Sequence, residues 1–184
     1  MSRVAVLADR VVSRSLVMDG ILITVSIAMM AVLAQISIPL WPVPVTLSTL
    51  AVMLIAASLG TARGTVSIVG YLSAGALGLP VFAGAVSLSA VRPTFGYLVG
   101  FVLAAVVIGY FVSKGADNSF FKMAAVFTLA SAIIYTTGAT WLVTGFGMDI
   151  QQAIAVGVVP FLIGDALKVL LASSLITGAR KLLN

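Results

Sequence analysis

VVPFLIGDALKVLLA, residues 158–172, is an apolar run that holds two charged side chains, Asp165 and Lys168. A charge at the centre of a membrane helix costs roughly 2.5–3.5 kcal/mol on insertion scales, and such residues usually face a cavity or a bundle interior. At positions i and i+3 of a helix the two side chains share one face. We therefore expect this face to point into the protein, either as a binding site or as a structural ion pair that locks the helix to a neighbour.

The composition of the whole chain places this run in a membrane protein. Hydrophobic residues make up 61% of the 184 residues and charged residues 8%, against about 25% charged residues in soluble domains, and the mean hydropathy is +1.24. A soluble fold of this length has no means of burying so much apolar surface, so we predict an all-α integral membrane protein. The formal charge of +5 is attributed to residues that set topology rather than to nucleic-acid binding.

Apolar windows predict six transmembrane helices in one bundle, which forms a single domain over residues 1–184 with a cytoplasmic segment at 1–16. Several predicted helices are short for a hydrocarbon core of about 30 Å, which favours tilt or partial crossing. The predicted helices lie near residues 17–38, 45–60, 64–79, 95–113, 122–144 and 153–179.

Basic residues are divided unequally between the two sides of this bundle. Six crossings place both termini on one side, whereas the loops of the other side hold Arg92 alone and Lys168 lies within a span. Because cytoplasmic loops are enriched in Lys and Arg, we expect both termini to lie in the cytoplasm and the chain to lie in the cytoplasmic membrane. The basic residues on the predicted cytoplasmic side are Arg3, Arg10, Arg14, Arg63, Lys114, Lys122, Arg180 and Lys181.

The outer connections carry most of the prolines and one long apolar segment. Residues 78–96, GLPVFAGAVSLSAVRPTFG, contain a single charge. Irregular backbone at membrane depth survives only where protein or a water-filled cavity satisfies it. We predict that this segment caps an outward-facing pocket, and the alternative is an interfacial segment that serves packing alone. Proline stiffens loops and breaks helices, and the prolines of this side are Pro39, Pro42, Pro44, Pro80, Pro93 and Pro160.

The chemistry of the charged pair favours one kind of ligand. A carboxylate accepts N–H donors and an ammonium donates to a carbonyl oxygen, so Asp165 and Lys168 together suit a urea or an amide. Pro160 and Gly164, just before and within the pair's helix, permit a kink or local unwinding that would free backbone groups for the same site.

Five more residues are candidates for the same pocket. Arg92 suits a carboxylate or phosphate, with a lipid headgroup as the alternative. Tyr97 and Trp41 offer rings that stack on a ligand, with an anchoring role at the membrane interface as the alternative. The remaining candidates come from the apolar segment and are Phe82 and Ser87.

Several classes of function find no support in the sequence. Histidine, cysteine and glutamate are absent, which excludes His and Cys metal ligands and Cys nucleophiles. Neither a G-x-x-x-x-G-K-[ST] phosphate loop nor a G-x-S-x-G motif occurs, so we expect no enzyme activity, cofactor or metal. We expect Trp141 in the interfacial aromatic belt and these aspartates in solvent: Asp9, Asp19, Asp117 and Asp149.

Five motifs give the chain a family resemblance from about residue 20 to residue 180. It resembles the BioY family, the biotin-specific S components of energy-coupling factor (ECF) transporters. It departs from the family's usual pattern at Ser48, Arg92, Phe95 and Ile163, where the family often has Gln, Gly, Gly and Pro. The motifs are AQISIPL (34–40), PVPVTLSTLAVML (42–54), GALGLPVFAG (75–84), RPTFGYLVGF (92–101) and FLIGDALK (161–168).

The resemblance implies an outward-facing biotin site in a six-helix protein. It also implies delivery through a transmembrane coupling (T) subunit with two cytoplasmic ATPases, or self-association in a solitary protein. The ureido ring of biotin carries N–H donors and a carbonyl that match Asp165 and Lys168, and its carboxylate would point toward Arg92. The alternatives are an S component for another vitamin and a membrane scaffold that transports nothing.

Overall fold

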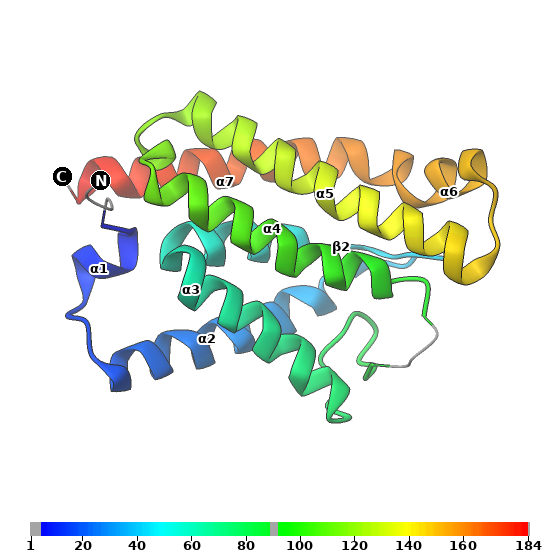
Figure 1. The fold of residues 1–184 in the computed structure, drawn as a ribbon, viewed down its shortest axis with the longest axis horizontal. Coiled ribbons are helices and arrows are strands. Elements are labelled where there is room, and N and C mark those ends of the chain that lie inside the picture. Colours follow the sequence, from blue (N-terminus) through cyan, green and yellow to red (C-terminus); the bar gives the residue numbers. More distant parts are fainter. Residues whose placement is uncertain (1–4, 89–91, 184) are drawn as a thin grey trace.

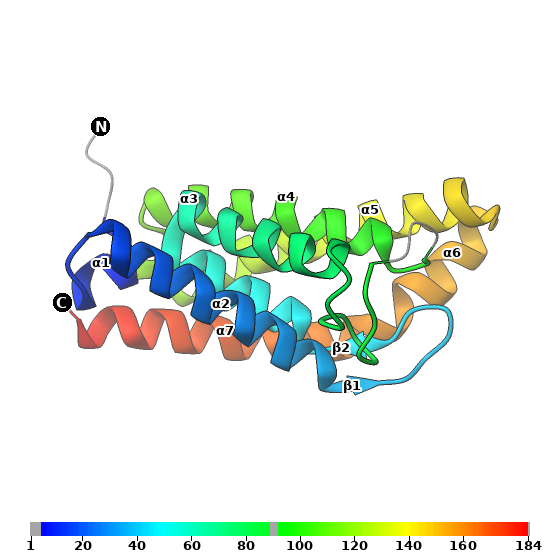
Figure 2. The same cartoon turned by 90° about the horizontal axis from the view of Figure 1, so that it is seen from below.

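The computed structural model describes residues 5–88 and 92–183, and almost all of its regular structure is helical (Figure 1). The long helices run side by side along the molecule, and α1 lies at the same end as the last turns of α7 (Figures 1 and 2). Two short strands, β1 (Ser37–Ile38) and β2 (Val45–Thr46), pair antiparallel. The helices are α1 (Leu7–Val11), α2 (Leu16–Gln35), α3 (Ser48–Ala76), α4 (Phe95–Ser113), η1 (Ala116–Asn118), α5 (Phe120–Phe146), α6 (Ile150–Gly157), η2 (Val159–Phe161) and α7 (Leu162–Leu182).

Within the described residues, five helices are long and apolar enough to cross a membrane, and the last of them runs from α6 into α7. The sequence predicted six because it treated α3 as two helices. The backbone of α3 leaves the helical region at Gly60, with φ +77° and ψ −175°, and the chain reverses there (Figure 1). A Cβ on Gly64 would lie 2.9 Å from the Cα of Ala56, whereas a straight helix separates these positions by about 12 Å. The two halves of α3 therefore form an antiparallel pair, and the number of membrane crossings stays a prediction.

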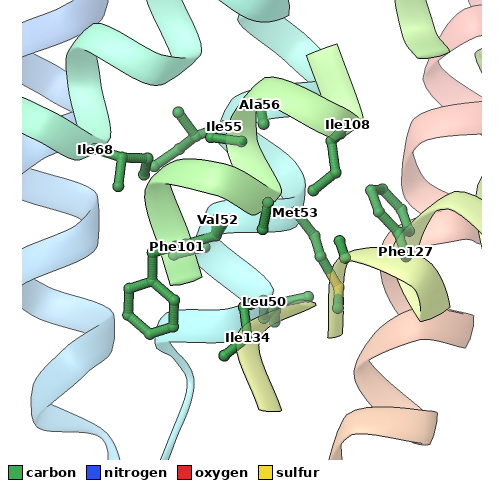
Figure 3. Close-up of a cluster of buried hydrophobic side chains, with 14 of the residues drawn as sticks. Leu50, Val52, Met53, Ile55, Ala56, Ile68, Phe101, Ile108, Phe127 and Ile134 are labelled. Atoms are coloured by element: carbon green, nitrogen blue, oxygen red, sulfur yellow. The ribbon is translucent and has the colours of Figure 1, made fainter. Parts of the chain in front are cut away.

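Small residues bring the helices of the bundle close together. A Cβ on Gly109 of α4 would lie 2.4 Å from the backbone of Thr61 in α3, and one on Gly100 would lie 2.8 Å from the Cα of Ile134 in α5. Around these contacts α3, α4 and α5 contribute interlocking side chains such as Met53 (Figure 3). Close packing of this kind holds membrane helices together, because lipid tails are as apolar as the side chains themselves.

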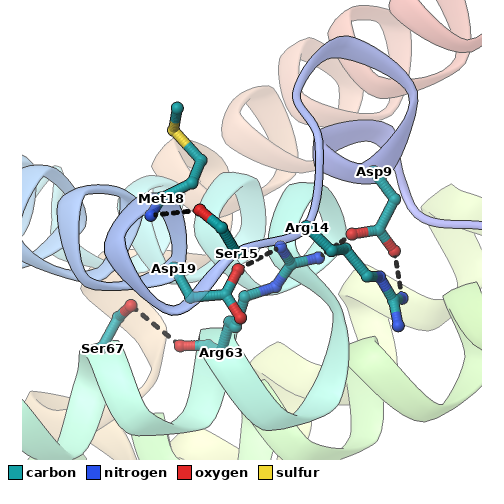
Figure 4. Close-up of polar contacts among 7 residues, drawn as sticks. All are labelled: Asp9, Arg14, Ser15, Met18, Asp19, Arg63 and Ser67. Atoms are coloured by element: carbon teal, nitrogen blue, oxygen red, sulfur yellow. Dashed lines mark hydrogen bonds and ion pairs between the residues drawn. The ribbon is translucent and has the colours of Figure 1, made fainter.

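The end of the bundle that carries α1 is held by charged side chains. Arg63 of α3 pairs with Asp9 of α1, and it pairs with Asp19 of α2 at 3.0 Å (Figure 4). Asp9 also binds Arg14, whose hydrogen bond holds the pKa of the Asp9 carboxyl below its usual range. These pairs tie α1 and α2 to the turn of α3.

Two aspartates at this end correct the expectation that they are solvated. The Asp9 side chain is 6% exposed, and Asp117 of η1 is fully buried with its carboxylate 3.0 Å from Nη1 of Arg180. Burial raises the pKa of Asp117, and the neighbouring Arg180 opposes that rise. The expectation failed because each carboxylate meets a cation from a distant part of the chain. Asp149, in contrast, is exposed as predicted and accepts a hydrogen bond from the backbone of Gln152 at the start of α6.

Candidate functional site

A cavity of about 340 Å³ lies where α3 and α4 begin, and both helices begin toward the end of the molecule remote from α1 (Figure 1). This volume falls in the range of about 300–1,000 Å³ that is typical of small-molecule sites. Aromatic side chains such as Tyr71, Phe101 and Phe161 make up much of the wall, and Asp165 and Lys168 contribute charged groups. The cavity is therefore mostly apolar with a few polar groups, which is the usual make-up of a ligand site.

The polar part of the cavity is a hydrogen-bonded cluster built around Lys168. Its ammonium donates to Asp165 Oδ1 at 2.7 Å, to the carbonyl oxygen of Thr46 at 2.6 Å and to Thr49 Oγ1 at 3.0 Å. Thr49 Oγ1 donates in turn to Asp165 Oδ1 at 3.1 Å, and the Tyr135 hydroxyl donates to Asp165 Oδ2 at 2.6 Å. The three donors of the ammonium are thus all used, whereas Asp165 Oδ2 accepts, within the part of the chain that the structure describes, from Tyr135 alone. A ligand N–H has an open position at Oδ2.

The predicted break in the last span places this cluster. Helix α6 ends at Gly157 and η2 holds Pro160, so α7 starts afresh at Leu162 with Asp165 in its first turn. A carboxylate there is stabilised by the positive end of the helix dipole. Proline cannot donate a backbone hydrogen bond, and the interruption that it causes brings Asp165 to the helix start.

Tyr97 binds the end of α6 at the break between α6 and α7, and it also lines the cavity. Its hydroxyl donates to the carbonyl oxygen of Gly157 at 2.7 Å, and a Cβ on Gly157 would lie 2.5 Å from that hydroxyl. The Tyr97 ring lies 6.1 Å from the ring of Phe161. Tyr97 therefore presents its ring to the cavity, while its hydroxyl is already occupied by the end of α6.

The apolar segment 78–96 lies against the cavity in its described parts, and residues 89–91 fall outside the described residues. Phe82 is 7% exposed and packs edge-on against Tyr71, with ring centroids 5.1 Å apart. Further along, Arg92 lines the cavity. Its carbonyl oxygen accepts a hydrogen bond from the indole nitrogen of Trp141 at 2.8 Å, so Trp141, expected only in the interfacial belt, also holds the end of this segment.

Two of the predicted site residues are not brought to the cavity. Trp41 is 84% exposed, while its neighbours Leu40 and Pro42 line the wall. Ser87 lies between Val86 and Leu88, which both line the wall. The two neighbours of Ser87 thus form the cavity wall at this point, and Ser87 itself does not.

Three residues of the cluster were not predicted from the sequence: Thr46, Thr49 and Tyr135. Thr46 ends β2, Thr49 lies three residues later in the first turn of α3, and Tyr135 is the single tyrosine of the predicted span 122–144. That spacing and that isolated tyrosine were the available signals. Neither indicates which face of its helix meets α7, so contact with Asp165 was not evident.

These features define a multi-pass membrane protein with a small-molecule cavity between its helices. Residues 6–184 match the BioY family, and the chain belongs to that family.

Known relatives agree with this membership over most of the chain. The biotin transporter BioY of Thermotoga maritima is 42% identical over 84% of this chain and 91% of its own length. The biotin transporter BioY of Rhizobium etli is 33% identical over 89% of this chain and 91% of its own length.

A solved structure supports the fold as well. The crystal structure of the S-component for biotin from an ECF-type ABC transporter superposes with a TM-score of 0.80 at 25% identity. The match covers 92% of this chain and 95% of the other. The family resemblance and the helical membrane fold predicted from the sequence are both confirmed.

Proposed function

We propose that this protein binds biotin and takes it up across the membrane as the substrate-specific S component of an ECF-type transporter. The observation that carries the proposal is the hydrogen-bonded cluster of Asp165, Lys168, Thr49 and Tyr135, whose two charged members are buried, in a mostly apolar cavity. A cyclic urea fused to an apolar ring system matches a site with this division of polar and apolar groups. The names of the relatives and of the solved S component point to the same ligand.

The ureido ring would bind the cluster through two contacts. An N–H of the ring donates to the open position on Asp165 Oδ2, beside the Tyr135 hydroxyl. The ring carbonyl accepts from Lys168 Nζ, which exchanges one of its three present partners for the ligand. Such an exchange replaces a hydrogen bond instead of breaking one, so the ammonium stays paired throughout.

Arg92 is the proposed partner of the carboxylate of biotin. It lies on the cavity wall at the opposite end of the segment from Phe82, and a guanidinium binds a carboxylate in a two-pronged geometry. The apolar rings of the ligand then lie between Arg92 and the charged pair, against aromatic side chains such as Tyr97 and Phe161.

The remaining parts of the proposal concern the setting of this site. The chain lies in the cytoplasmic membrane with both termini in the cytoplasm, as the distribution of Lys and Arg predicts. The cavity then opens outward. A transmembrane coupling subunit with two ATPases would power release, because the sequence holds no phosphate-binding loop of its own, and self-association is the alternative for a solitary protein.

Calorimetry on the purified protein tests the ligand and the role of Asp165 together. We expect wild type to bind biotin and Asp165→Asn to bind it at least about tenfold more weakly, since a hydrogen bond to a charged group contributes about 1.5–3 kcal/mol. Asp149→Asn is the matched control, because Asp149 is exposed and asparagine also caps helices well. Wild type that fails to bind biotin refutes the function, and unchanged affinity in Asp165→Asn refutes the ureido contact.

A thermal-shift panel of vitamins separates the alternatives. Biotin alone should raise the unfolding temperature, because a ligand that binds only the folded state stabilises it. A larger shift with another vitamin would identify an S component for that vitamin. The absence of any shift would favour the scaffold, in which the charged pair is structural.

A further inference from the structure

The side chain of Gln35, the last residue of α2, forms hydrogen bonds with the turn formed by residues 81–86. Its side-chain nitrogen lies 3.2 Å from the carbonyl oxygens of both Val81 and Phe82 and 3.1 Å from that of Ala31 in its own helix, so its two N–H groups are shared among three acceptors. Its side-chain oxygen accepts from the backbone N–H of Ala85 at 3.0 Å. One side chain thus binds three backbone groups of a single turn.

The turn has few hydrogen bonds of its own. Phe82 and Val86 exchange two backbone hydrogen bonds, at 3.0 and 3.3 Å. Between them Gly84 has φ +77° and Ala85 has φ +52°, and a side chain is disfavoured in that left-handed region. The contact from Gln35 to the Ala85 N–H therefore supports the residue whose backbone conformation is least favourable.

The same turn forms one wall of the cavity. Phe82, Ala83, Gly84 and Val86 all line it, and the Phe82 ring lies so close to Gly75 that a Cβ there would come within 2.2 Å of the ring. Among the described residues, none of the lining side chains comes from α2. The side chain of Gln35 therefore does not line the cavity itself, and it reaches the cavity wall through the turn.

We propose that Gln35 is a positioning residue for substrate: it keeps the 81–86 turn closed over the cavity and so links retention of the ligand to the position of α2. This rests on the proposed biotin function. Helix α2 is suited to such a link, because only 11% of its most apolar window is buried, the lowest share among the five long helices. A displacement of its outer end would pull on the carbonyl oxygens of Val81 and Phe82.

The test uses two readouts on the full chain. Because the sequence has no cysteine, Ala83→Cys introduces one thiol in the turn, and its labelling rate with a membrane-impermeant maleimide reports opening without biotin. Dissociation of radiolabelled biotin is measured separately on the cysteine-free protein. The variants are Gln35→Leu, which removes all three contacts with the turn, and Gln35→Glu, which removes the donations to Val81 and Phe82 but keeps an acceptor for Ala85. Gln151→Leu, at an exposed position on α6, is the control.

We expect both Gln35 variants to label faster and to release biotin faster by about tenfold, with the control at the wild-type rates. Unchanged labelling and unchanged release overturn the proposal. Faster labelling with unchanged release also overturns it, because the turn would then be held without retaining ligand. Faster release with unchanged labelling shows that Gln35 acts by another route and equally overturns it. If wild type fails to bind biotin, the proposed function falls, and the labelling rates still decide whether Gln35 holds the turn.

Discussion

The groups around Asp165, more than its charge alone, determine how this buried carboxylate is accommodated. It is 3% exposed, yet its oxygens meet an ammonium and two hydroxyl groups, from Lys168, Thr49 and Tyr135. A buried charge is tolerated when it is paired and hydrogen-bonded, and this cluster satisfies both conditions before any ligand arrives. Asp165 and Lys168, whose charges look costly in the sequence, therefore belong to a hydrogen-bonded network. Within the described residues, this network leaves one acceptor position open, on Asp165 Oδ2.

Tyr135 is the member of that network whose removal is most informative. We expect Tyr135→Phe to weaken biotin binding by about tenfold, because the hydroxyl that orients Asp165 Oδ2 is lost while the ring remains in place. Calorimetry measures the change. Tyr110→Phe is the control, since Tyr110 is half exposed on α4. Wild-type affinity in Tyr135→Phe would show that the carboxylate needs no orienting donor.

At this scale the sequence predicted the charged residues and missed their neutral partners. A charge in an apolar run stands out whatever lies around it, so Asp165 and Lys168 were identified from spacing. Tyr135 carries no such signal, because tyrosines near membrane surfaces commonly serve as anchors. Its role depends on how α5 is rotated against α7, which follows from packing and not from local sequence.

Helix α3 shows how a single glycine shapes an element. The left-handed backbone at Gly60 reverses the chain so that Thr49 reaches the cavity from one half of α3 and Tyr71 from the other. Gly75, near the end of the second half, leaves the space that the Phe82 ring fills. The capping turn thus depends on a helix position that has no side chain.

The substitution Gly75→Ala tests whether the turn that carries Phe82 depends on the space at Gly75. We expect Gly75→Ala to weaken biotin binding by at least about tenfold, because a Cβ 2.2 Å from the Phe82 ring must displace the ring, and overpacked sites commonly cost about 1–3 kcal/mol. The binding constant is measured together with thermal stability. Gly178→Ala is the control, since a Cβ there meets no atom of the described residues within 4 Å. Equal affinities in the two variants would rule out a role for the packed ring.

The short helix α1 provides a test of pH dependence at the scale of an element. The pKa of Asp9 is lowered, first by its hydrogen bond to Arg14 and also by Arg63. A lowered carboxyl pKa contributes stability above the unfolded value of about 3.9, and that contribution is lost as the pH falls through the folded value. We expect Asp9→Asn to lose less thermal stability than wild type as the pH falls from 6 to about 2.5, measured by tryptophan fluorescence. Asp149→Asn should follow wild type, and identical curves for all three would show that the α1 pairs do not stabilise the fold.

Elements were predicted more reliably where backbone chemistry marks their ends. Pro160 predicted the interruption between α6 and α7, and the charged turn around Arg63 separated the two halves of α3. The helices α1 and η1 were missed. They have 5 and 3 residues, and such short helices form by docking against the rest of the molecule, since isolated short helices are unstable in water.

The whole molecule is closed at the α1 end by contacts between distant parts of the chain. Arg180 of α7 meets Asp117 of η1 at 3.0 Å and donates to the carbonyl oxygen of Ala5 at 2.7 Å and to the side chain of Asn118 at 3.3 Å. Three segments that are far apart in the sequence converge on one guanidinium. No local pattern predicts such a contact, which is why Asp117 was expected in solvent.

A double-mutant cycle tests what this ion pair contributes. We expect Asp117→Asn to destabilise the protein by about 3–5 kcal/mol, because it leaves the cation of Arg180, which is 4% exposed, without its carboxylate. Asp117→Asn combined with Arg180→Met should recover part of the loss, since an apolar replacement of a buried pair is often close to neutral. Thermal unfolding in detergent compares wild type, both single variants and the double variant. Biotin binding by the folded variants should stay at wild-type strength, because the pair lies at the α1 end, remote from the cavity (Figure 1). Losses that simply add in the double variant would show that Asp117 and Arg180 stabilise the bundle independently and not as a pair.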